Sequence, residues 1–323
     1  MLLALTLATL AAAALALLIG SVTIDLGRAL GAPDSPDHAI LFDHRLPRML
    51  MGLATGAVLA ASGAALQGLL RNALADPFIL GVSGGAALGG AAVGLTGLAA
   101  FIAAPLGGFA GAVAALFLVT ALASRRRGIS PLHMLLVGVV VNAFAGALLM
   151  FLQALAGPAA VQRVVLRLMG SLAVDPSQPL TLPLVLAASA LGLALTMAHA
   201  RDLDLLALGD DGARALGVDP DRLRRRLFVA LSVPIGAVVA TTGLIGFVGL
   251  IVPHGVRLAL GPDHRLLLPA SALAGGVFVL LADLLVRTLT GPLGTELPVG
   301  VLTTAVGGPV FLWLLRRESG ATS

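Results

Sequence analysis

The sequence has no cysteine, no lysine and no tyrosine, and it is poor in charge. The lack of cysteine excludes disulfides, thiolate metal sites and cysteine nucleophiles. The lack of lysine excludes a Walker A loop, because that loop needs its lysine to hold nucleotide phosphates. A nucleotide-driven activity would therefore need a second chain. Charged residues make up 11% of the chain, whereas a soluble domain uses about 25% to cover its surface.

Long apolar runs fill most of the 323 residues, 58% of which are hydrophobic. A spanning helix uses about 20 apolar residues. We therefore predict an all-α polytopic membrane protein with about ten transmembrane helices in a single domain, residues 1–323. The first run lacks the basic start of a signal peptide and is too long for one, so we interpret it as a span. The expected spans are 1–24, 49–69, 79–99, 101–122, 132–153, 181–200, 227–245, 246–260, 266–288 and 297–315.

Arginine clusters between the apolar runs indicate the orientation, because short arginine-rich loops stay on the cytoplasmic side. With ten alternating spans and a cytoplasmic N-terminus, most arginines lie inside, and the C-terminus is cytoplasmic too. The net charge of +4 follows from this topology, so nucleic acid is not an expected partner. The eighth run is short and glycine-rich, which predicts a broken or re-entrant segment. The amphipathic stretch from Val161 to Met169 is expected to lie along the membrane surface.

Residues 201–226 form the longest polar segment, and this orientation places them inside. Leucines give the segment an apolar component, and Gly209 and Gly217 predict two short helices joined by a turn. A merely solvated loop does not need so many leucines. Two interpretations stay open: a loop packed against its own bundle, or a docking surface for a cytoplasmic partner.

Several motifs resemble the permease subunits of ABC importers for iron-siderophore complexes, haem and cobalamin. They follow one another in the order and spacing of that family, from about residue 40 onward. Ala73 is a departure, because the family usually has proline after Asn72, and we expect only a local effect. The matching segments are RLPR (45–48), SGAALQGLLRNALADPFILGVSGG (62–85), GLIGFVGLIVPHGVR (243–257), HR (264–265), LAD (281–283) and ELPVG (296–300).

The resemblance implies a transport subunit with no catalytic residue and no metal site of its own. It implies a multi-pass protein of the bacterial inner membrane that acts as a homodimer. Two cytoplasmic ATPase subunits would bind ATP and magnesium, and one extracytoplasmic solute-binding protein would deliver the substrate. Lipid would surround the dimer, and no cofactor would bind to this chain. Substrate would pass by alternating access along a pathway lined largely by the fifth and tenth spans.

The resemblance also assigns residues to each partner. Arg45 and Arg48, with Arg287 as a third, would dock the acidic groups of the binding protein; anchoring at the membrane interface is the alternative. The 201–226 segment would seat in the ATPase. The coupling residues would be Leu208, Gly209, Asp210, Ala213, Leu216 and Gly217. The cytoplasmic gate and pathway would use Pro131, Leu132, Asn142 and Gln153.

Four questions remain open at this point. The substrate is an iron chelate or, as the second candidate, cobalamin. Asp283 lies deep in the ninth span, where it either couples to protons or closes a helix contact with Arg287 one turn on. An ion-coupled secondary transporter would need paired ionisable residues near the midplane, and Asp283 is the one candidate in the sequence. Asn142 and Gln153 either meet the substrate or bond neighbouring helices.

Overall fold

The structure is a computed structural model that describes residues 1–78, 80–95, 100–125, 128–129, 131–157, 162, 165, 168–293 and 297–321. Its helices are α1 (Leu2–Leu18), α2 (Leu26–Gly31), α3 (Pro36–Ala39), the π-helical turn η1 (Ile40–Arg45), α4 (Leu46–Leu70), α5 (Val82–Leu95), α6 (Ala100–Ala123), α7 (Pro131–Leu155), α9 (Thr181–Ala198), α10 (Ala200–Ala207), α11 (Asp210–Ala215), α12 (Pro220–Thr242), α13 (Val248–Leu260), α14 (His264–Leu293) and α15 (Val299–Ala321). Two short antiparallel strands, β1 (Ser124–Arg125) and β2 (Gly128–Ile129), join α6 to α7.

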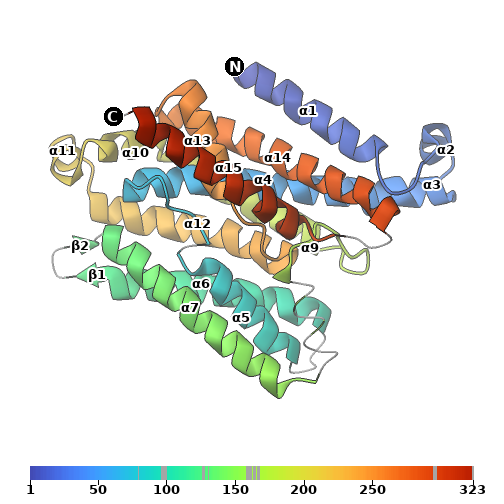
Figure 1. Cartoon of the computed structure of the whole chain (residues 1–323), viewed down its shortest axis with the longest axis horizontal. Coiled ribbons are helices and arrows are strands. Elements are labelled where there is room, and N and C mark those ends of the chain that lie inside the picture. Colours follow the sequence, from blue (N-terminus) through green and yellow to red (C-terminus); the bar gives the residue numbers. More distant parts are fainter. Residues whose placement is uncertain are drawn as a thin grey trace.

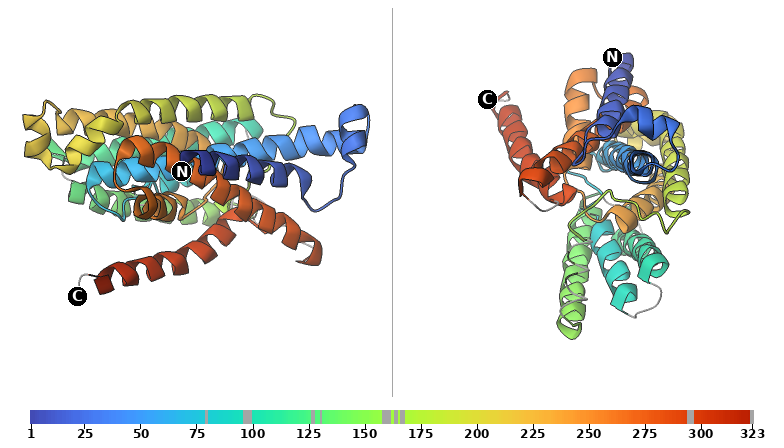
Figure 2. Two further views of the ribbon diagram at one scale, coloured as in Figure 1. Left: turned by 90° about the horizontal axis from the view of Figure 1, so that it is seen from above. Right: turned by 90° about the vertical axis from the view of Figure 1, so that its right-hand side faces the viewer.

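The long helices lie roughly side by side along the longest axis of the molecule (Figure 1). The short helices α10 and α11 lie at one end of this bundle, called here the α10–α11 end, and α2 and α3 lie at the opposite end, called the α2–α3 end. In the two further views, α15 diverges from the bundle, and α5, α6 and α7 form a group on one side (Figure 2). The all-α polytopic fold expected from the apolar runs is confirmed.

Each of the ten predicted apolar runs falls on a helix of the structure, although the boundaries differ. In the described part of the chain, five helices are long and apolar enough to cross a membrane, and four apolar helices are shorter. The chain is therefore a multi-pass membrane protein, while the count of ten spans and the cytoplasmic termini stay predictions. The stretch from Val161 to Met169, expected on the membrane surface, lies largely outside the described residues.

The eighth run, expected to be broken or re-entrant, is one short continuous helix. Its helix α13 has 13 residues and begins only after Phe247, which has a left-handed φ of 68°. The seventh run starts earlier than predicted. Asp219 caps α12 by accepting hydrogen bonds from the backbone amides of Asp221 and Arg222, at 3.0 and 3.1 Å. The predicted 201–226 segment therefore includes the first turns of α12.

Helix α4 lies at the centre of the bundle and is buried on nearly all sides. Its glycines allow other backbones to come close, as small residues do in membrane bundles. Gly63 packs against the backbone of Gly249 on α13, and Gly56 packs against Gly275 on α14. Both α13 and α14 are thereby fixed against one central helix.

Candidate functional site

The segment at the α10–α11 end is built from two short helices joined at a glycine. Gly209 has a φ of 97° between α10 and α11, and Gly217 has a φ of 87° after α11. Both values suit glycine, which has no Cβ to oppose them. The two short helices and the turn predicted from the sequence are thus present.

The leucines of this segment divide between two sides. Leu203, Leu206 and Ala213 are fully buried, so they fasten α10 and α11 to the bundle. Leu208 and Leu216 are 65% and 56% exposed. One set of apolar side chains therefore packs inward, and the other is left on the surface.

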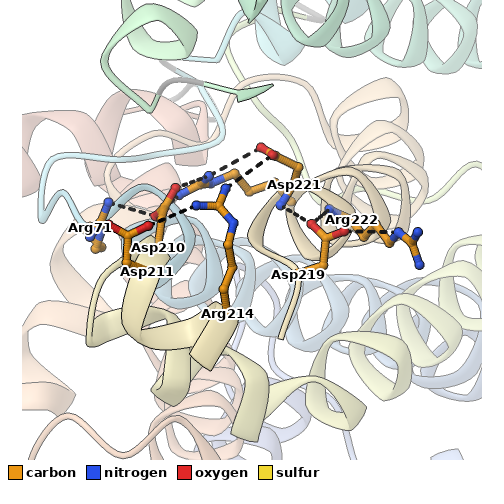
Figure 3. A network of polar contacts seen from close by, with 8 residues as sticks. Arg71, Asp210, Asp211, Arg214, Asp219, Asp221 and Arg222 are labelled. Atoms are coloured by element: carbon orange, nitrogen blue, oxygen red, sulfur yellow. Dashed lines mark hydrogen bonds and ion pairs between the residues drawn. The ribbon is translucent and has the colours of Figure 1, made fainter. Parts of the chain in front are cut away.

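A network of ion pairs ties this segment to the bundle (Figure 3). The carboxylate of Asp210 accepts two hydrogen bonds from Arg224 on α12, at 2.8 and 2.9 Å, and one from Arg71 at the end of α4, at 3.0 Å. The side chain of Arg224 is completely buried. The hydrogen bond from Arg224 is the main reason that the pKa of Asp210 lies below its ordinary value. Two helices of the bundle thus hold α11 through one carboxylate.

A second carboxylate connects α10 to α14. Oδ1 of Asp204 accepts a hydrogen bond of 2.9 Å from the backbone amide of His264, the first residue of α14. The same oxygen lies 2.6 Å from Nδ1 of the His264 ring. His264 is 4% exposed. Because α14 runs to the α2–α3 end, this contact joins the α10–α11 segment to a helix that spans the molecule.

The predicted docking arginines lie together toward the α2–α3 end, but they are not open to solvent. Arg45 and Arg287 are 5% and 8% exposed, and both donate to backbone carbonyls at the end of α1. The Arg48 guanidinium reaches Asp283, with Nη2 at 2.8 Å from Oδ1. Nε of Arg287 lies 3.0 Å from Oδ2 of the same carboxylate. Asp283 thus closes the expected contact with Arg287 and has Arg48 as a second partner.

The predicted gate and pathway residues lie on one helix, α7. Leu132 is 64% exposed near its start, while the side chain of Pro131 lies outside the described part. Asn142 lies farther along, where its Oδ1 is 3.4 Å from the hydroxyl of Ser83 on α5. Gln153, near the end of α7, is partly exposed. The structure thus brings Asn142 to a helix contact, and its role in a pathway stays a prediction.

Ser83 lies in a pattern that could be taken for a catalytic motif. Residues 81–85 (GVSGG) match the GxSxG pattern of a serine nucleophile. The Ser83 hydroxyl is buried, donates to the carbonyl of Phe78 at 3.3 Å and faces an asparagine. A nucleophilic serine needs a base such as histidine in that position. The pattern here belongs to helix packing. Within the described ranges, no three His, Cys, Asp or Glu side chains are grouped to hold a metal ion.

Sequence reasoning missed the roles of Asp204, Arg224 and Asp76. The first two sit in arginine- and aspartate-rich segments where pairing cannot be deduced from the order of residues. Asp76 lies in the connection between α4 and α5 and is 4% exposed. Its Oδ1 accepts a hydrogen bond of 2.7 Å from the amide of Phe78. Burial raises the pKa of the Asp76 carboxyl to about 6.

Replacement of Asp76 by asparagine is expected to stabilise the protein at pH 7. The folded state binds the Asp76 proton more tightly than the unfolded state, so this group's contribution to stability falls as pH rises from about 4 to 6. Asparagine keeps the oxygen that accepts from Phe78 and carries no charge. The gain is up to about 3 kcal/mol at pH 7 and close to zero at pH 4.

Thermal unfolding in detergent at both pH values measures this difference, with the exposed Asp34→Asn as the control. A loss of stability in Asp76→Asn at pH 7 would show that the buried carboxylate is favourable and would contradict the prediction.

Comparison with known proteins identifies the family to which this arrangement belongs. Residues 7–317 match the model of the FecCD transport family. The chain belongs to the FecCD transport family. The resemblance inferred from the sequence motifs is thereby confirmed.

The FecCD relatives include permeases of importers with different substrates. The chain is 43% identical over 286 residues to the cobalamin import system permease protein BtuC of Halobacterium salinarum, covering 88% of this chain and 75% of the relative. It is 42% identical over 284 residues to the hemin transport system permease protein HmuU of Yersinia pestis, covering 85% and 82%. It is 42% identical over 282 residues to the Fe(3+) dicitrate transport system permease protein FecD of Escherichia coli, covering 86% and 85%.

A solved structure of an inward-facing metal-chelate type ABC transporter shares this FecCD fold. Its TM-score is 0.82 at 33% identity, and the match covers 98% of each chain.

Proposed function

We propose that this protein is the membrane-spanning permease subunit of a binding-protein-dependent ABC importer of the bacterial inner membrane. The observation that carries the proposal is the α10–α11 segment. It exposes Leu208 and Leu216, while ion pairs of Asp210 and the hydrogen-bonding contacts of Asp204 with His264 hold it to α4, α12 and α14. An exposed apolar surface on rigidly linked short helices is suited to receive force from a partner and to pass it to several helices.

In this proposal the single permease domain has ten spans with both termini in the cytoplasm, and the α10–α11 end faces the cytoplasm. Two ATPase subunits bind and hydrolyse ATP, and each seats the segment that carries the proposed coupling residues Leu208, Gly209, Asp210, Ala213, Leu216 and Gly217 of one permease copy. Leu208 and Leu216 make the contact, and the buried Ala213 packs against the bundle from within. The permease contributes no chemistry; it has two arrangements, and the nucleotide state of the ATPases changes their populations.

Two copies of the chain would form the pathway. The gate residues Pro131 and Leu132 lie at the start of α7, next to the α10–α11 end, where closure of the ATPases would act on them. Asn142 and Gln153 follow along the same helix. Exposed apolar side chains on α7, such as Val140 and Phe144, are 66% and 64% exposed in the single chain, which is consistent with contact to lipid or a second copy.

The α2–α3 end would then face outward and receive the solute-binding protein. The side chain of Arg48 is 14% exposed, whereas that of Arg287 is 9% exposed. Arg–carboxylate pairs give orientation as well as attraction, which suits docking of an acidic partner. Arg45 and Arg287 are 5% and 8% exposed and donate to carbonyls of α1, so docking by them would require their guanidinium groups to leave those carbonyls.

The proposed substrate is an iron chelate, either a ferric siderophore or haem, with cobalamin as the second candidate. Haem and ferric citrate permeases are 42% identical to the chain and a cobalamin permease is 43% identical, so identity alone does not separate the substrates. Uptake of radiolabelled ferric siderophore, haem and cobalamin into vesicles that contain the complete transporter would separate them.

The rival mechanism, an ion-coupled secondary transporter, depends on Asp283. That carboxylate is fully buried between Arg48 and Arg287. Both guanidinium groups contact it, at 2.8 and 3.0 Å, which favours a structural ion pair that joins helices.

Purification in mild detergent with an affinity tag tests the proposal. We expect an ATPase partner to co-purify with the parent protein and uptake to require ATP. Leu208→Glu combined with Leu216→Glu should reduce the co-purified ATPase about tenfold, because two apolar contacts at an interface contribute roughly 1–2 kcal/mol. Leu30→Glu on α2, at the opposite end and 69% exposed, is the control. The absence of any ATPase partner from the parent preparation would overturn the proposal.

A further inference from the structure

The carbonyl end of α1 has an unusual set of partners. The last four carbonyls of a helix have no partner within it and must be satisfied by other groups. The amide of Ile19 still donates to Leu15, at 2.8 Å. The carbonyls of residues 16–19 then remain for groups outside the helix. In a bilayer, where water is scarce, an unsatisfied carbonyl is costly.

Two arginines from distant parts of the sequence supply these partners. Nη1 of Arg287 on α14 donates to the carbonyls of Ala16 and Ile19, at 3.0 and 3.1 Å. Nη1 of Arg45 donates to the carbonyls of Leu17 and Leu18, at 2.7 and 2.8 Å. All four carbonyls therefore receive a hydrogen bond from a guanidinium group. Nη2 of Arg45 also donates to the carbonyl of Val22, beyond the helix.

Charge favours the same arrangement. The carbonyl end of a helix carries a partial negative charge that attracts cations. Hydrogen bonds from a charged guanidinium are stronger than those from a neutral donor. Asp283 completes the set, because its carboxylate holds Nε of Arg287 at 3.0 Å while Nη1 of Arg287 points to α1.

The chain between α1 and Arg45 begins and ends at this cap. Residues 20–44 leave the end of α1, form α2 and α3 beyond the bundle, and return to the cap at Arg45 (Figure 1). Both ends of this excursion therefore meet at the same two guanidinium groups. The place where α1 is held therefore bears on where α2 and α3 lie.

We propose that Arg45 and Arg287 are positioning residues that clamp the carbonyl end of α1 and so fix the α2–α3 segment on the face where the binding protein would dock. The importance of that face rests on the proposed function; the clamp itself does not. An acidic partner could bind either guanidinium only by taking N–H groups from α1.

Spin-label distance measurements test the clamp in the full-length protein in lipid. The chain has no native cysteine, so Ala32→Cys in the α2–α3 segment and Leu184→Cys on α9 introduce the two label positions. We expect one narrow distance distribution in this parent. Arg45→Gln and Arg287→Gln should each at least double its width, because glutamine cannot bond two carbonyls with a charged fork. Arg28→Gln, an exposed arginine on α2, should leave the width unchanged.

Two further variants keep the test decisive if a glutamine variant does not fold. Arg45→Lys retains the cation without the planar fork and should give an intermediate width. Asp283→Asn removes the carboxylate that orients Arg287 and should also broaden the distribution. Unchanged widths in the Arg45 and Arg287 variants, or equal broadening in Arg28→Gln, would overturn the clamp. No ATPase is needed for this measurement, so failure of the importer proposal in the co-purification experiment would be seen separately.

Discussion

Replacement of Asp210 by asparagine is expected to destabilise the α10–α11 end and to abolish ATP-dependent uptake. The variant leaves the guanidinium of Arg224 buried without its closest carboxylate. Breaking a buried ion pair by removing one partner costs about 3–5 kcal/mol, and the carboxylate of Asp221, 3.7 Å from Arg224, retains part of the attraction. We expect a loss of about 3 kcal/mol at pH 7. Uptake falls because α11 is no longer fixed to α4 and α12.

The pH dependence of this effect has a defined direction. The pKa of Asp210 is lowered in the folded state, chiefly by the Arg224 hydrogen bond. The stability that it contributes is therefore complete above about pH 4 and is lost as pH falls below that value. The difference between the parent and Asp210→Asn should shrink accordingly in acid.

Asp211→Asn is the matched control, since Asp211 is the next residue and its side chain is fully exposed. Its pair with Arg214, at 3.3 Å, is a surface contact that contributes little. Thermal unfolding in detergent and vesicle uptake should separate the two variants clearly. If both lose stability equally, the buried pair is not the element that holds α11. In a double-mutant cycle, Arg224→Gln should add little to Asp210→Asn.

Replacement of Gly63 by alanine is expected to destabilise the protein more than the addition of a methyl group at any other glycine of the bundle core. A Cβ at Gly63 would fall on the carbonyl oxygen of Gly249 in α13. That atom belongs to the backbone and cannot rotate away, so α13 must move from α4. The movement separates fully packed side chains, including Leu59 at 1% and Val248 at 0% exposure. Overpacking costs about 1–3 kcal/mol, and with a helix displaced we expect a loss of about 3 kcal/mol or more.

Gly255→Ala on α13 provides the comparison. A Cβ at Gly255 meets no atom within 4 Å, so alanine fits there and favours the helix by about 0.5–1 kcal/mol. Thermal unfolding in detergent should therefore shift in opposite directions for the two glycine variants. A Gly63→Ala protein as stable as Gly255→Ala would show that the α4–α13 contact is loose enough to accept a methyl group.

The fold was predictable to a large extent because the bilayer leaves few choices. A span must satisfy its own backbone groups, so every long apolar run becomes a helix. The ten runs fall on ten helices, and the eighth, expected to be broken, is the short continuous helix α13. The boundary of α12 was wrong by about two turns. Charged residues at its start hid the helix from an apolar criterion, although Asp219 and Pro220 are a typical capping pair.

The candidate site divides in the same way. Gly209, Gly217 and the leucines predicted the two short helices and their turn, because those signals are local. The partner of Asp210 could not be found in this way. Several arginines lie near Asp210 in the sequence, and the bidentate contact goes to the completely buried Arg224.

The sequence by itself determined two things. Its scarcity of charged residues indicates a membrane bundle, and its lack of lysine excludes a Walker A loop. Both follow from composition, which does not depend on contacts between distant residues. The order of its motifs determined the family. Only the tertiary structure decided what the arginines at the α2–α3 end do. Arg45 and Arg287 are 242 residues apart in the numbering (287 minus 45), yet they cap one helix end. A guanidinium binds whichever oxygens the packed helices bring within about 3 Å, and the sequence does not contain that distance.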